Sequence, residues 1–133
     1  MAENLKILLV EDDLINQKVA NSILKRRNHQ LTIADNGRIG VDLYLKNNYD
    51  VILMDIQMPV LDGIEATKLI RKYEKELNKK IIIIAVTAYS LDKDKERIMA
   101  AGMDNYLSKP YKPNDLLDII DSTLILFNKK NDI

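Results

Sequence analysis

Acidic side chains follow two of the most apolar runs of the chain. Glu11 and Asp12 come directly after the run ILLV, and Asp55 comes directly after the run VILM. Thr87 follows a third run, IIIIAV, and Lys109 follows the short segment NYLS. Clustered carboxylates resist ionisation without a counter-ion, and a hard divalent cation such as Mg²⁺ meets that need. A hydroxyl and an ammonium group suit the oxygens of a phosphoryl group, whose transfer needs mainly positioning and charge neutralisation. If one edge of a fold gathers these side chains, they predict phosphoryl transfer with Asp55 as the nucleophile.

The elements that must position these groups alternate along the chain between apolar runs and helical patterns. Strands are expected over residues 5–10, 31–34, 51–54, 81–86 and 105–107. Helices are expected over residues 14–24, 38–46, 62–77, 90–101 and 112–127. Runs such as IIIIAV lack a polar alternation, which is typical of strands buried on both faces of a parallel sheet.

The fold class follows from this alternation. Right-handed crossovers place helices on both faces of the sheet. We therefore expect an α/β fold, a three-layer, doubly wound (βα)5 sandwich with a five-stranded parallel sheet in the order 2-1-3-4-5, as in flavodoxin-like proteins. Ligands of such sheets bind beyond the carboxyl ends of the strands, where the strand order reverses. The acids that follow the first and third strands would meet there. We expect one domain over residues 1–133, with a core over about 5–127 and a tail over 128–133.

The helices give two kinds of local expectation. Asp13 is expected to cap the first helix, and Asp62 the third, where Glu65 three residues later makes a variant of the capping box. The expected inward face of the first helix consists of Leu14, Ile15, Val19, Ile23 and Leu24. The expected apolar stripe of the third helix consists of Ala66, Leu69, Ile70, Tyr73 and Leu77.

Composition excludes several classes of function. The chain has 20 basic and 20 acidic residues, so no overall charge favours nucleic acid. It has no cysteine, which excludes disulfides, zinc–thiolate sites and cysteine nucleophiles. The apolar run near the start, ILLV, is too short for a signal peptide or a membrane span. We expect a cytoplasmic protein that neither binds nucleic acid directly nor inserts into a membrane.

The motifs ILLVEDD, VILMDIQMPVLDGIEA, IIIIAVTA and YLSKP resemble the receiver domain of two-component response regulators, in the CheY-like superfamily. The resemblance covers about residues 6–126. It implies that Asp55 accepts a phosphoryl group with Mg²⁺ as cofactor. The implied metal ligands are Asp12 directly, Glu11 mainly through water, Asp55, and the main-chain carbonyl of Gln57.

The same resemblance implies a conformational switch. Thr87 and Lys109 would contact the phosphoryl group, and the peptide bond before Pro110 would be cis. After phosphorylation the Thr87 hydroxyl would move toward the phosphate and Tyr106 would turn inward. That change would alter the face made by the fourth helix, the fifth strand and the fifth helix. The residues expected to tune hydrolysis of the aspartyl phosphate are Gln57 and Tyr89.

The resemblance also names the kind of partner. The pair Glu11-Asp12 with Asn16 four residues after Asp12, together with QMPVLDG, looks most like receivers of hybrid histidine kinases. The phosphodonor would be a sensor histidine kinase or hybrid kinase, and a histidine phosphotransfer protein could be a further partner. The domain would assist its own phosphorylation without being a turnover enzyme. A phosphorylation-dependent homodimer, and the choice between a stand-alone protein and a piece of a hybrid kinase, stay open.

Other interpretations fit the residues less well. A haloacid-dehalogenase-type phosphatase would need a second acid two residues after its nucleophile, where this chain has Gln57. A dinucleotide-binding fold would need a glycine-rich turn after the first strand, and an acidic turn stands there. His29 lacks the helical context of a phosphorelay histidine, so we interpret it as a loop residue. The alternative that stays open is a receiver-like module that binds partners without being phosphorylated.

Overall fold

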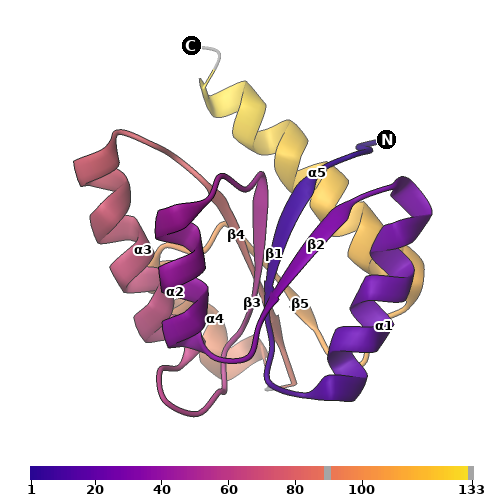
Figure 1. Ribbon diagram of the computed structural model, residues 1–133, viewed down its shortest axis with the longest axis horizontal. Helices are drawn as coiled ribbons and strands as arrows, with labels where there is room; N and C mark the ends of the chain where they lie inside the picture. Colours follow the sequence, from indigo (N-terminus) through magenta and orange to yellow (C-terminus); the bar gives the residue numbers. More distant parts are fainter. Residues whose placement is uncertain (89–90, 132–133) are drawn as a thin grey trace.

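Parallel strands and helices alternate through the computed structural model, which describes residues 1–88 and 91–131 (Figure 1). The strands in this part of the chain are β1 (Lys6–Val10), β2 (Gln30–Ala34), β3 (Val51–Asp55), β4 (Ile82–Thr87) and β5 (Asn105–Ser108). The helices are α1 (Leu14–Leu24), α2 (Gly37–Lys46), α3 (Gly63–Leu77), α4 (Leu91–Ala101) and α5 (Pro113–Asn131), with a short 3₁₀ helix, η1 (Lys25–Arg27), after α1.

The sheet has the predicted order, β2-β1-β3-β4-β5, with every neighbouring pair parallel. Val10 of β1 lies beside Met54 of β3. Glu11 and Asp55, the next residues along each strand, therefore reach the carboxyl edge of the sheet together. On the other flank Thr87 lies beside Ser108, which immediately precedes Lys109. The register thus delivers all the expected chemical groups to one edge.

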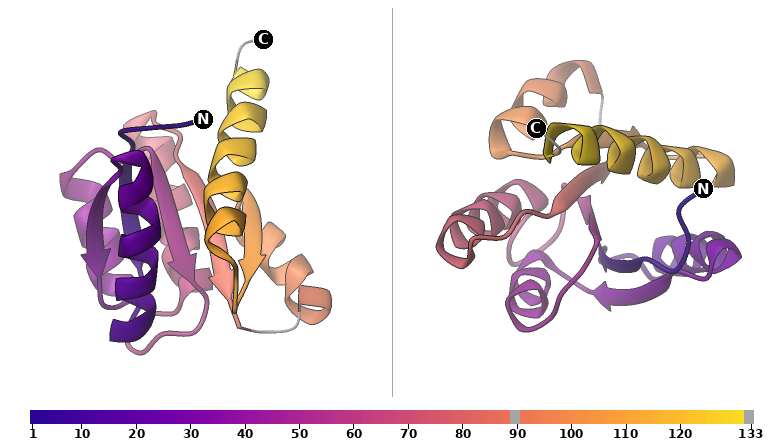
Figure 2. Two further views of the ribbon diagram at one scale, coloured as in Figure 1. Left: turned by 90° about the vertical axis from the view of Figure 1, so that its right-hand side faces the viewer. Right: turned by 90° about the horizontal axis from the view of Figure 1, so that it is seen from above.

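Two apolar cores separate the three layers. Helices α2, α3 and α4 pack on one face of the sheet, and α1 and α5 pack on the other (Figures 1 and 2). The central strands are almost fully enclosed: β1 after Lys6, and all of β3 and β4 are buried. This burial holds the ends of β1, β3 and β4 rigidly, which is what a precise site at their tips requires.

The expected inward face of α1 is wrong in its first half. Leu14, Ile15 and Val19 are 68%, 72% and 46% exposed. The residues of α1 that are buried are Gln17, Ala20, Ile23 and Leu24. The buried stripe is therefore rotated on the helix, and it begins with a polar side chain. The first turn of α1 presents its large apolar side chains to solvent beside the carboxyl edge of the sheet.

Both predicted helix caps are confirmed. The Asp13 carboxylate accepts hydrogen bonds from the backbone N–H of Ile15 and Asn16, and the Asp62 carboxylate accepts one from the N–H of Glu65. At the end of α3, Leu77 is 44% exposed rather than part of an inward stripe. Helix α5 continues to Asn131, through residues that the sequence assigned to a tail. No helix in the described part of the chain is both long enough and apolar enough to span a membrane.

Candidate functional site

Three carboxylates converge beyond the ends of β1 and β3. Oxygen atoms of Glu11, Asp12 and Asp55 all lie within 4.8 Å of one another. Glu11 is 3% exposed and Asp55 is 9% exposed, whereas Asp12 is open to solvent. Two anchored acids and one accessible acid therefore face the same small volume.

Lys109 closes this cluster from the β5 side. Its Nζ lies 2.5 Å from Glu11 Oε1 and 3.2 Å from Asp55 Oδ2. Its backbone N–H donates to the carbonyl of Thr87 at 2.8 Å, and the Lys109–Pro110 peptide bond is cis. Burial alone would lower the pKa of Lys109, but the hydrogen bond to Glu11 and the charges of Asp55 and Glu11 outweigh it and raise that pKa. The ammonium group is therefore charged at neutral pH.

The charges of this cluster do not balance. Three carboxylates surround one ammonium group, which leaves two negative charges when all the acids are ionised. Desolvation, followed by the hydrogen bond and charge of Glu11, raises the pKa of Asp12. A divalent cation would supply the missing charge, and carboxylate oxygens with accessible water are the donor set that Mg²⁺ prefers. The residues present therefore fit Mg²⁺ by both charge and donor type.

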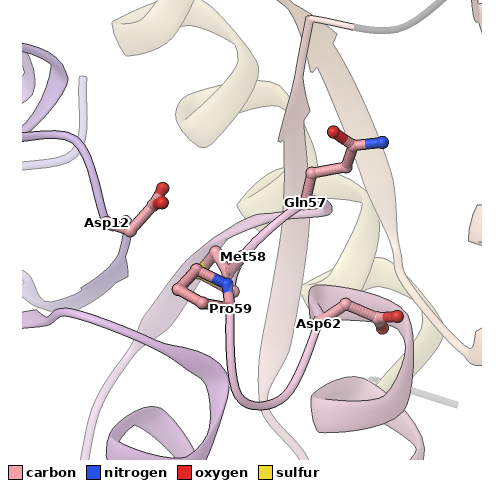
Figure 3. A pocket seen from close by; sticks show the side chains of 5 residues that line it. All are labelled: Asp12, Gln57, Met58, Pro59 and Asp62. Carbon is pink, nitrogen blue, oxygen red and sulfur yellow. The ribbon is translucent and has the colours of Figure 1, made fainter.

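The loop from β3 to α3 forms the other wall of the site. A shallow hollow is lined by Asp12 on one side and by Gln57, Met58, Pro59 and Asp62 on the other (Figure 3). The backbone N–H of Gln57 lies 3.3 Å from Asp55 Oδ1, so the loop contacts the carboxylate through its main chain.

This loop makes an unusually tight turn. The N–H of Leu61 donates to the carbonyl of Pro59 at 2.8 Å, and Val60 between them has a φ of 71°. This is the classic γ-turn, a rare and strained conformation for a β-branched residue. Val60 is 79% exposed, so its side chain gains no burial in return.

Gly63 fixes the backbone of Asp55. Its N–H donates to the carbonyl of Ile56 at 2.9 Å, and a Cβ at this position would lie 2.0 Å from the carbonyl oxygen of Asp55. Real Cβ atoms do not approach oxygen so closely, so only glycine permits this contact. The start of α3 is thereby pressed against the residue that carries the central carboxylate. The sequence indicated Gly63 only as the beginning of a helix, because this contact depends on tertiary packing.

The comparison with known families agrees with this geometry. A family model described as the response regulator receiver domain matches residues 7–121. The chain belongs to the receiver domain family of response regulators. This confirms the resemblance seen in the motifs.

Relatives of this receiver domain occur in much longer proteins. The hybrid signal transduction histidine kinase I of Dictyostelium discoideum is 40% identical over 131 residues, which cover 95% of this chain and 8% of the kinase. Among solved structures, the receiver domain of the sensor histidine kinase PA1611 of Pseudomonas aeruginosa is 40% identical, with a TM-score of 0.81. The match covers 91% of this chain and 97% of that one, and that structure has a magnesium ion coordinated in the active-site cleft. The chain therefore spans a small fraction of the curated kinase and nearly all of the solved receiver.

A second solved structure concerns a partner. It is the Saccharomyces cerevisiae complex of the histidine phosphotransfer protein Ypd1 with the receiver domain of Ssk1. The match is 34% identical, covers 87% of this chain and 86% of that one, and has a TM-score of 0.82. The similarity to that receiver domain therefore extends over most of both chains.

The remaining predicted residues fall at different depths in the receiver domain. Thr87 is fully buried at the end of β4. Tyr106 is half-buried against the core under α4, and the ammonium of Lys95 lies 5.8 Å from the centroid of its ring. Tyr89 lies outside the described residues, so its expected tuning role stays a prediction.

Two buried polar residues have roles that the sequence did not indicate. His29 lies in the loop before β2, as predicted; it is 6% exposed, and its Nδ1 accepts a hydrogen bond from the N–H of Leu5 at 3.1 Å, so it is a structural loop residue. Gln17 is 7% exposed and contacts the backbone of Glu11. The sequence offers one indication that Gln17 is buried: it stands three residues before Ala20, and therefore on the same side of α1.

Proposed function

We propose that this receiver domain accepts a phosphoryl group on Asp55 from a phosphohistidine protein, in a reaction that requires Mg²⁺. The observation that carries the proposal is the convergence of three strand-end carboxylates within 4.8 Å, with Lys109 in contact with two of them. In the reaction, a carboxylate oxygen of Asp55 forms a bond to phosphorus while the bond from phosphorus to the histidine nitrogen breaks. The electron pair of that bond stays on the imidazole, which then takes up a proton.

The residues of the chain divide the work of this transfer. Asp12 and Asp55, the carbonyl of Gln57, and Glu11 through water would hold Mg²⁺, and the ion would neutralise phosphoryl oxygens in the transition state. Lys109 would move from its carboxylate partners to a phosphoryl oxygen as negative charge arrives. Thr87 would donate its hydroxyl to another oxygen. Asp55 is held by Gly63 and by the buried strand β3, so the nucleophile is positioned before the donor arrives.

The switch would follow from the same charge. The phosphoryl group adds negative charge and acceptor oxygens next to Lys109 and Thr87. Movement of Thr87 toward the phosphate would open space at the end of β4, and Tyr106 would turn into it from β5. Lys95, which now lies over the Tyr106 ring, would lose that contact, so the change would reach α4. A Tyr106→Trp variant would report this motion by fluorescence, because the chain contains no other tryptophan.

The partner would approach the exposed start of α1. Leu14 and Ile15 are both exposed there, and they lie two and three residues after Asp12 along the chain. Large apolar side chains in this position would pack against the helices of a histidine kinase or a histidine phosphotransfer protein. The domain would act as a signalling module in the cytoplasm rather than as a turnover enzyme.

The test is incubation with a small phosphodonor, with and without Mg²⁺, followed by intact mass measurement. We expect one added phosphoryl group in the wild type with Mg²⁺ and none in Asp55→Asn. The matched control is Asp50→Asn, since Asp50 lies at the opposite end of β3 and should leave the adduct unchanged. An unphosphorylated wild type would instead favour the alternative, a module that binds partners independently of phosphorylation.

A further inference from the structure

A buried glutamine joins two strand ends beneath the acidic cluster. The Gln17 side chain rises from α1, and its Nε2 donates to the carbonyl oxygen of Glu11 at 2.6 Å and to Asp35 Oδ1 at 3.0 Å. An amide nitrogen carries two hydrogen atoms, so both are used. The side chain is 7% exposed, and it replaces an apolar residue on the inward face of the helix.

The carbonyl that Gln17 contacts belongs to the peptide group between Glu11 and Asp12. Strand β1 ends at Val10, so this carbonyl has left the ladder of the sheet. The N–H of Glu11 is still held by the carbonyl of Ala34, at 3.0 Å. Gln17 of α1 therefore holds the peptide group between Glu11 and Asp12. The preceding peptide group, between Val10 and Glu11, is held by Ala34 of β2.

We propose that Gln17 is a positioning residue for the metal site: by fixing the Glu11–Asp12 peptide, it sets the direction in which Asp12 presents its carboxylate. This inference rests on the proposed function, because it assigns Gln17 a part in holding Mg²⁺. Glu11 is held independently, since its carboxylate contacts Lys109 and accepts the N–H of Asp13 at 3.2 Å. Asp12 is exposed, and its carboxyl group interacts with Glu11 and with its own backbone, which both meet at the peptide group that Gln17 holds, so Asp12 depends most on Gln17.

Removal of the two donors tests this role. Gln17→Met preserves the length of the side chain and lacks both N–H groups. Side chains that hydrogen-bond to a metal ligand without touching the metal typically contribute about 10–100-fold to the affinity for the metal. We therefore expect Gln17→Met to bind Mg²⁺ about tenfold more weakly than the wild type in calorimetric titration with Mg²⁺ alone.

A matched control separates positioning from general loosening of the fold. Thr123 is likewise buried, and its Oγ1 accepts a hydrogen bond from Asn105 Nδ2 at 3.0 Å, at the opposite end of β5 from Lys109. Thr123→Val removes a buried side-chain hydrogen bond and should leave the Mg²⁺ affinity unchanged. If Gln17→Met does not fold, Gln17→Asn keeps the amide on the same helix and shortens its reach, and it should weaken Mg²⁺ binding in the same direction.

A second readout needs no metal. The carbonyl ¹³C resonance of Glu11 should shift in Gln17→Met and stay in place in Thr123→Val, because only the first variant removes its hydrogen bond. Equal Mg²⁺ affinities of the wild type and the Gln17 variant would overturn the role of Gln17, as would an equal loss in Thr123→Val. Absence of Mg²⁺ binding by the wild type would overturn the proposed function itself.

Discussion

The contact between Gly63 and the backbone of Asp55 predicts that a single methyl group there disables the site. In Gly63→Ala the new Cβ would lie 2.0 Å from the carbonyl oxygen of Asp55 and 2.9 Å from its carbonyl carbon. Non-bonded heavy atoms prefer a separation of about 3.5 Å. Helix α3 and the end of β3 must therefore separate by about 1 Å or more, and the hydrogen bond from Gly63 to Ile56 lengthens or breaks.

The magnitude of the effect follows from this displacement. Overpacking a buried position costs about 1–3 kcal/mol in the free energy of unfolding. A displacement of about 1 Å at a reacting group can cost about 100-fold in rate. We expect Gly63→Ala to remain folded while its rate of phosphorylation by a small phosphodonor falls by about that factor at saturating Mg²⁺. The assay is a time course of intact mass, with urea denaturation of the same samples.

Gly102→Ala is the matched control. Gly102 has a φ of 99°, and a Cβ there would lie 3.0 Å from the side chain of Arg71, so alanine is strained at this position as well. It lies just after α4, at the end of the sheet opposite the acidic cluster. We expect a comparable loss of stability with an unchanged phosphorylation rate. A folded Gly63→Ala protein that is phosphorylated as fast as the wild type would refute the positioning argument.

Other predictions concern stability. Val60→Gly removes the strain of the γ-turn and gives up little buried surface. We therefore expect the free energy of unfolding, measured by urea denaturation, to rise by about 1 kcal/mol. A lower free energy of unfolding would contradict the strain at Val60. Arg71 contacts two carboxylates and two backbone carbonyls, and its side chain is only 20% exposed. Arg71→Met should therefore lower the free energy of unfolding by about 2–3 kcal/mol. A loss below about 1 kcal/mol in the same assay would refute the importance of these contacts. Burial, and then the charge of Arg27, lowers the pKa of His29, so the unfolded state binds more protons and stability should fall as pH drops below about 6.5. In His29→Gln this part of the pH dependence should disappear. If the free energy of unfolding fell as steeply between pH 7 and pH 5.5 in His29→Gln as in the wild type, the pH dependence could not be assigned to His29.

The strand-end arrangement could be predicted because it depends on local signals. The buried strands are continuous apolar runs, and each chemical group directly follows its own run. When these strands lie parallel, Glu11 and Asp55 therefore reach the same edge of the sheet. The helix caps at Asp13 and Asp62 are equally local. Both depend on side chains that bond to backbone groups within three residues.

The wrong predictions and the contacts that were not predicted both arise from packing. Leu14 and Ile15 fit an amphipathic pattern, but periodicity cannot distinguish an apolar face that enters the core from one left beside a site. Gln17 and His29 are polar and buried because their partners come from other segments, which no local pattern records. The close contact at Gly63 likewise joins two backbones that the sequence describes separately.

The most direct test of the central claim is phosphotransfer from a protein donor. A histidine phosphotransfer protein carrying ³²P on its histidine would be mixed with the wild type and with Asp55→Asn, each with Mg²⁺ and with a chelator. We predict that the label moves to the wild-type receiver domain only when Mg²⁺ is present, and that it stays on the donor with Asp55→Asn. Transfer to Asp55→Asn at the wild-type level, or transfer to the wild type without Mg²⁺, would contradict the assignment of Asp55 and its metal site.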